Sequence, residues 1–117
     1  MANDFDVDTH RDGQTVFIHL AGELDIMSGE AFNEELELAM QSAPEQIVLD
    51  LGRLTFMDSA GLQLILAAEA GCRTEFGSSL SIIPGPRAVM RILEITGVDN
   101  LLNCFSASGE KSALKRS

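Results

Sequence analysis

The segment TFMDSAGL, residues 55–62, decides how this chain folds. Its first three residues end an apolar, strand-like run, and Leu62 opens a long apolar run with the character of a helix. Asp58 and Ser59 stand between the two runs, where a hydroxyl would lie at a helix N-terminus beside backbone N–H donors. Such a position is suited to carrying or binding a phosphate, so Ser59 is the first functional candidate.

Strands and helices alternate on both sides of this segment. Strands are predicted at residues 5–8, 15–21, 47–51 and 80–83, and helices at 29–42, from 58 or 59 to about 70–72, and at 86–96; residues 101–105 form either a short edge strand or a docked segment. This order predicts an α/β fold with a mixed sheet of four to five strands and three or four helices. We expect one domain over residues 1–105 and a flexible basic tail over residues 106–117.

Local signals mark where these elements begin and which way they face. Gly13 can take a positive φ in a turn between the first two strands, and Ser28 can cap the first helix. Alternation places Val16 on one face of the second strand and His19 on the other. Because residues 47–51 are almost all apolar, we expect helices on both faces of the sheet.

The start of the second helix leaves two questions open. Either Asp58 or Ser59 can act as its N-cap, since both residue types are common caps. Gly61 costs roughly 0.5–1 kcal/mol relative to alanine inside a helix, which indicates that another group approaches the backbone closely there.

The second helix is apolar on several sides. Leu62, Ile65 and Leu66 fall on one side, and Leu64 adds apolar area elsewhere. One interpretation is a helix wedged between the sheet and its neighbours. The other is a docking patch for a partner that includes Met57 and Leu64.

Charge and composition exclude several classes of function. The chain of 117 residues carries 18 acidic and 8 basic residues, and residues 1–109 alone have a net charge of −12. This acidity argues against nucleic-acid binding and favours a basic protein partner. The apolar stretch at residues 62–68 is far shorter than the roughly 20 residues that cross a bilayer. The N-terminus lacks the features of a signal peptide, so we expect a cytoplasmic protein that is not bound to a membrane.

Residues for metal binding or catalysis are sparse. Cys72 and Cys104 lie far apart and outside any metal-ligand spacing, so both are predicted to be reduced thiols, with no metal and no cofactor. A nucleophilic Ser59 would need a base, yet His10 and His19 are the only histidines and no Gly-x-Ser-x-Gly elbow is present. No Gly-x-x-x-x-Gly-Lys loop for nucleotides occurs either. We therefore do not expect an enzyme.

The segment FMDSAGL, residues 56–62, follows the strand at 47–51 and the sequence GELD at residues 22–25. In this order and spacing the chain resembles the bacterial anti-sigma factor antagonists, which are members of the STAS domain family, over about residues 5–105. The Asp-Ser-x-Gly-Leu pattern is fairly specific when a buried strand precedes it and an apolar helix follows.

The resemblance implies a partner-switching function. The unmodified antagonist would bind an anti-sigma factor that is also an ATP-dependent serine kinase, and would thereby free the sigma factor for transcription. Phosphorylation of Ser59 by that kinase would end the interaction, and a serine phosphatase would restore it. The residues implied in partner binding are Asp25, Met57, Asp58, Ser59, Ala60, Gly61, Leu62 and Leu64.

Two alternatives remain open. A STAS module can instead bind its partners constitutively, as a subunit of a stress-signalling or transporter complex. A homodimer through the apolar helices is also compatible with the sequence.

Overall fold

The computed structural model describes residues 4–97, 103–105 and 111–113. The elements in chain order are β1 (Phe5–Asp12), β2 (Thr15–Leu24), the short 3-10 turn η1 (Ile26–Ser28), α1 (Gly29–Gln41), β3 (Gln46–Met57), α2 (Ser59–Gly71), the π-helical turn η2 (Cys72–Phe76), β4 (Ser79–Ile83), α3 (Arg87–Thr96), β5 (Asn103–Phe105) and β6 (Lys111–Ala113). No helix among these residues is long and apolar enough to cross a membrane.

The six strands form one mixed sheet in the order of the sequence. β1 and β2 pair antiparallel, β2 to β5 run parallel, and β6 pairs antiparallel with β5. The predicted α/β class, with a mixed sheet and three α-helices, is confirmed. The sheet has one strand more than the sequence predicted. The additional strand is β6, which lies within residues 106–117 and has no alternating pattern that would predict it. The rest of that segment lies outside the described residues, so its flexibility stays a prediction.

The opening hairpin forms as the sequence predicted. Gly13 has a φ of +66° in the turn between β1 and β2. Val16, Ile18 and Leu20 are buried on the helix side of β2, while His19 on the other face is only partly buried. Period-two alternation was sufficient to assign both faces.

β3 is twelve residues long and continues well beyond the predicted end at Leu51. Exposed Gly52 and Arg53 interrupt the apolar run, yet the strand continues with irregular pairing to β2. Leu54 and Met57 then return to the core. This extension brings the end of β3 level with the end of β2, where Leu24 and Met57 are partners in the register.

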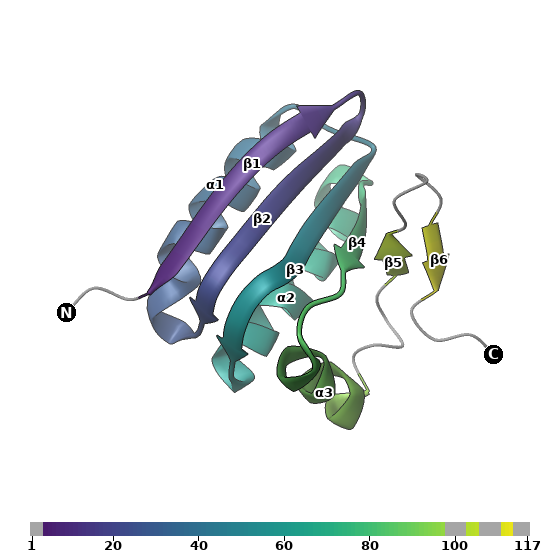
Figure 1. Ribbon diagram of the computed structural model, residues 1–117. Helices are drawn as coiled ribbons and strands as arrows, with labels where there is room; N and C mark the ends of the chain where they lie inside the picture. Colours follow the sequence, from purple (N-terminus) through teal and green to yellow (C-terminus); the bar gives the residue numbers. More distant parts are fainter. Residues whose placement is uncertain (1–3, 98–102, 106–110, 114–117) are drawn as a thin grey trace.

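Helices cover one face of the sheet. Figure 1 shows α1 and α2 behind the strands and α3 beyond the end of β4, while no helix among the described residues lies over the front of β1, β2 and β3. The prediction of helices on both faces is therefore wrong. That prediction was based on the apolar run at residues 47–51. Ile47 pairs in register with Val16, which faces the core, so alternation places only Val48 and Asp50 of the run on the open face.

Candidate functional site

The candidate site lies at the carboxyl ends of two neighbouring parallel strands. Figure 1 shows β2 and β3 ending at the same edge of the sheet. Because Leu24 and Met57 are register partners and each ends its strand, the residues that follow them, Asp25 and Asp58, emerge at this edge. Carboxyl ends of parallel strands are where open α/β sheets place their binding sites.

Both aspartates act as N-caps of the helical turns that follow them. The Asp25 carboxylate Oδ1 accepts a hydrogen bond from the backbone N–H of Met27 at 3.0 Å. The Asp58 carboxylate Oδ1 accepts one from the N–H of Gly61, also at 3.0 Å. The cap of α2 is therefore Asp58, which resolves the choice between Asp58 and Ser59.

Ser28 occupies the N-cap position of α1, as the sequence predicted. Ser28 precedes α1, but it makes no side-chain hydrogen bond that caps this helix. Its hydroxyl donates instead to the carbonyl of Glu23 at 2.6 Å, and it accepts from the N–H of Asp25 at 3.2 Å. Ser28 thus completes a capping box with Asp25 and fixes the turn η1 against the end of β2.

Ser59 is the first residue of α2, and its side chain is exposed. Among the described residues, none forms a hydrogen bond with its hydroxyl. A phosphate on this oxygen would lie at the positive end of the α2 dipole, beside N–H groups of the first turn. Ser59 is thus free to react without removing the cap of its helix.

Gly61 is held against the end of β2. A Cβ atom on Gly61 would lie 2.2 Å from the carbonyl oxygen of Leu24 and 2.8 Å from the Met57 Cγ. The close approach predicted from the sequence is thus made by the chain itself. It packs α2 tightly against β2 and so holds Ser59 in place at the edge.

The eight residues implied in partner binding lie around this edge but differ in accessibility. Ser59 is exposed, and Asp25, Asp58, Ala60 and Leu64 are partly exposed. Met57 is 2% exposed, Leu62 is 6% exposed and Gly61 is buried, so these three shape the site from beneath. Leu64 packs on the core cluster and lies close to Gly29 of α1. Core packing therefore explains much of the apolar character of α2, as in the wedged-helix interpretation.

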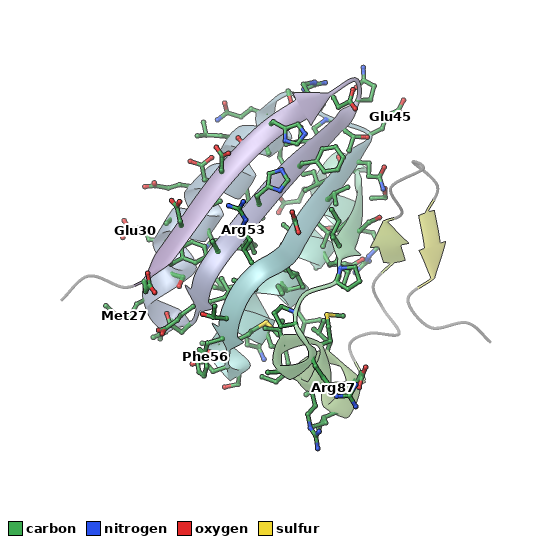
Figure 2. All side chains as sticks on the ribbon, in the orientation of Figure 1. Met27, Glu30, Glu45, Arg53, Phe56 and Arg87 are labelled. Atoms are coloured by element: carbon green, nitrogen blue, oxygen red, sulfur yellow. The ribbon has the colours of Figure 1, made fainter. Side chains whose placement is uncertain are left out.

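Three large apolar side chains at this edge were not singled out as a group from the sequence. Ile26 and Met27 of η1 are 77% and 70% exposed, and Phe56 near the end of β3 is 46% exposed. Figure 2 shows Met27 and Phe56 at the same end of the sheet. The sequence does carry one sign of this surface. Ile26 and Met27, two large apolar residues, directly follow Asp25 in a three-residue turn, and neither reaches the core. Together with Asp25, Asp58 and Ser59, we call them the strand-end surface.

The sequence and the fold are similar to those of known proteins. The family described as "Mlab, STAS domain" matches residues 7–103. The "Anti-sigma-B factor antagonist" of Listeria monocytogenes is 28% identical over 100 residues, which cover 86% of this chain and 87% of that protein.

Two solved structures of SpoIIAA share the fold. The unphosphorylated form of this anti-sigma factor antagonist matches with a TM-score of 0.73 and 22% identity, covering 88% of this chain and 90% of that one. The phosphorylated form of the Bacillus protein matches with a TM-score of 0.67 and 22% identity, covering 88% and 94%.

Proposed function

The chain belongs to the STAS domain family, and we propose that it is an anti-sigma factor antagonist whose partner binding is switched off by phosphorylation of Ser59. The similarity to the Listeria antagonist over most of both chains supports this role. The partner would be an anti-sigma factor with serine kinase activity, in the cytoplasm, and its capture would release a sigma factor for transcription.

The observation that carries the proposal is the exposed hydroxyl of Ser59 directly after a complete helix cap. Asp58 satisfies the N–H of Gly61, so α2 keeps its cap whether or not Ser59 is modified. A phosphate adds a charge of about −1.5 to −2, which the positive end of a helix dipole tolerates. The phosphorylated protein should therefore remain folded.

The same charge would change what the strand-end surface can bind. Asp25 and Asp58 already place two carboxylates there, next to the exposed apolar side chains of Ile26, Met27 and Phe56. In contact with a partner that buries this surface, a phosphate would add like-charge repulsion and a desolvation cost. Binding should fall while the fold persists.

The chemistry of phosphorylation would come from the partner. A kinase supplies Mg-ATP and the catalytic base, so this chain needs only a reachable acceptor oxygen. It would act as a substrate and a binding protein rather than as a catalyst, and a separate serine phosphatase would return it to the binding form.

Binding of two Ser59 variants to the purified anti-sigma factor tests the proposal. Ser59→Asp adds a charge and Ser59→Asn adds nearly the same volume without one. We expect Ser59→Asp to bind at least tenfold more weakly than wild type in calorimetry and Ser59→Asn to bind nearly as well, with native circular dichroism for both. Equal affinity of wild type and Ser59→Asp would contradict the switch and favour the constitutive subunit.

A further inference from the structure

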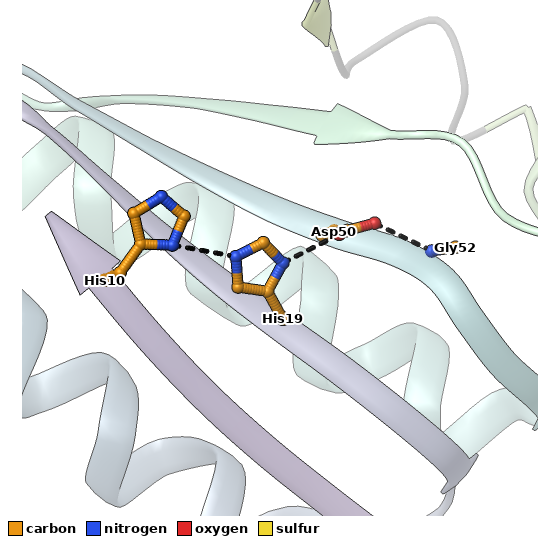
Figure 3. Close-up of polar contacts among 4 residues, drawn as sticks. All are labelled: His10, His19, Asp50 and Gly52. Atoms are coloured by element: carbon orange, nitrogen blue, oxygen red, sulfur yellow. Dashed lines mark hydrogen bonds and ion pairs between the residues drawn. The ribbon is translucent and has the colours of Figure 1, made fainter. Parts of the chain in front are cut away.

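The open face of the sheet carries a chain of polar side chains that the strand-end surface does not use. Figure 3 shows His10 of β1, His19 of β2 and Asp50 of β3 side by side on three neighbouring strands. The His19 Nδ1 lies 2.7 Å from the Asp50 Oδ2, and the His19 Nε2 lies 3.0 Å from the His10 Nδ1. These are the only two histidines of the chain.

Asp50 determines which nitrogen of His19 is available. The other carboxylate oxygen of Asp50 accepts a hydrogen bond from the N–H of Gly52 at 2.9 Å, which fixes the carboxylate. A carboxylate only accepts, so the His19 Nδ1 carries the proton and donates it. In the neutral ring the Nε2 then has a lone pair, and it faces the His10 Nδ1. Metal-binding histidines are oriented by carboxylates in this way.

Each of the two rings contacts a neighbour outside the pair. The ring of His10 stacks on the ring of Phe17 with centroids 4.8 Å apart, whereas the rings of His10 and His19 lie edge to edge with centroids 5.0 Å apart. The interplanar angles are 10° and 13°. Phe17 therefore orients the His10 ring and Asp50 orients the His19 ring, although this face is open to solvent.

We propose that the His10 Nδ1 and the His19 Nε2 together bind one divalent transition-metal ion, such as Ni²⁺, Cu²⁺ or Zn²⁺. With metal–nitrogen bonds near 2.05 Å, two neighbouring ligands are about 2.9 Å apart in square-planar geometry and about 3.3 Å apart in tetrahedral geometry. The observed separation of 3.0 Å lies between these values. The two nitrogens are thus already at a chelating distance, and the rings must turn so that both lone pairs point at the ion instead of along the hydrogen bond.

Metal binding changes the tautomer of His10 but not the number of protons on the two rings. Without metal, the His10 Nδ1 donates its proton to the lone pair of the His19 Nε2. On binding, that proton leaves Nδ1 and the His10 ring takes the tautomer protonated at Nε2, so both ligating nitrogens present lone pairs to the ion. His19 keeps its Nδ1 proton on Asp50 throughout.

The acidic surroundings of His19 favour a cation. A hollow of about 360 Å³ beside His19 is lined by Asp6, Asp8 and Asp50, with Arg53 as the one base. No group of three or more His, Cys, Asp or Glu residues in the described part of the chain could hold a metal ion jointly. The ion would therefore have two protein ligands and complete its coordination with water, and its affinity would be below that of a closed structural zinc site.

Calorimetric titration of the untagged full chain with Ni²⁺ tests this site. We expect one ion per chain, a loss of affinity of at least tenfold in His10→Gln and in His19→Gln, and a loss of about tenfold in Asp50→Asn through the orientation of His19. Glu37→Gln removes an exposed acid on α1 and should leave the affinity unchanged. Wild-type affinity in the His10→Gln/His19→Gln double variant would overturn the proposal.

A second measurement on the wild-type chain avoids any effect of the substitutions on folding. In ¹⁵N spectra of the histidine side chains, Zn²⁺ should shift the His10 Nδ1 and His19 Nε2 resonances most strongly. The His19 Nδ1 should keep the signature of a protonated nitrogen. Zn²⁺ shifts centred on the His10 Nε2, or no shifts at either histidine, would contradict the chelate.

Discussion

At the scale of single residues, Asp58, Ser59 and Gly61 have different functions within one helical turn. Asp58 caps α2, Ser59 presents its hydroxyl to solvent, and Gly61 lets the turn pack on the carbonyl of Leu24. The reactive group is thus positioned by two neighbours that are themselves fixed by backbone contacts.

The close contact at Gly61 predicts a loss of stability in Gly61→Ala. Alanine is the better helix former by about 1 kcal/mol, yet its Cβ would overlap the Leu24 carbonyl oxygen. We expect the overlap to dominate and the free energy of unfolding in urea to fall by about 1–3 kcal/mol. Gly71→Ala in the same helix is the control, because nothing lies within 4 Å of its Cβ. A Gly61→Ala protein as stable as Gly71→Ala would show that β2 does not constrain the turn.

Cys72 gives a prediction for alkaline pH. Burial, and secondarily the charge of Glu69, raise the pKa of this thiol to about 11 from 9.0. Between pH 9 and 11 the thiol of the unfolded chain loses its proton while the thiol of the folded chain keeps it. The free energy of unfolding should therefore fall over this range, by roughly 2–3 kcal/mol in total. Urea unfolding under reducing conditions measures this fall, and Cys72→Ala should show a correspondingly smaller one. Identical pH slopes for the two proteins would contradict the buried thiol.

At the scale of elements, the length of β3 determines the site. Its last six residues, 52–57, bring Met57 level with Leu24, and so place η1 and the start of α2 at one edge of the sheet. The sequence indicated the strand-to-helix change at Asp58 because that signal is local. Ile26 and Met27 gave a local signal after Asp25, but the sequence did not place Phe56 beside them, because that depends on the register of β2 and β3.

The exposed residues of η1 predict an effect on binding without an effect on folding. Met27→Ser should weaken binding to the anti-sigma factor severalfold or more, since it removes apolar area that a partner would cover. Its side chain is 70% exposed, so the unfolding midpoint should hardly move. Ile95→Ser on α3 is the matched control, because Ile95 is 72% exposed and its element starts from a different strand end. Equal losses of affinity in both variants would argue against a surface confined to the ends of β2 and β3.

At the scale of the whole molecule, the sheet separates two chemically different regions. The helices cover one face, while the open face carries His10, His19 and Asp50 (Figures 1 and 3). The class of fold could be predicted from the order of elements. The open face could not be predicted, because an apolar run such as residues 47–51 is compatible with helices on one face of the sheet or on both.

The position of Ser59 is the part of the site that the sequence predicts most directly. A hydroxyl between an apolar strand and an apolar helix is visible without long-range contacts, and the structure leaves it exposed. Which neighbours hold it could be known only from the paired strands, as the contact between Gly61 and Leu24 shows.

The most direct test of the central claim is mass mapping of the protein after incubation with its anti-sigma factor kinase and Mg-ATP. We expect one phosphoryl group per chain, on the peptide that contains Ser59. We expect no phosphate on Ser59→Ala and full phosphorylation of Ser42→Ala, which removes another exposed serine. Undiminished phosphorylation of Ser59→Ala, or a phosphate mapped to a different residue of the wild type, would contradict it.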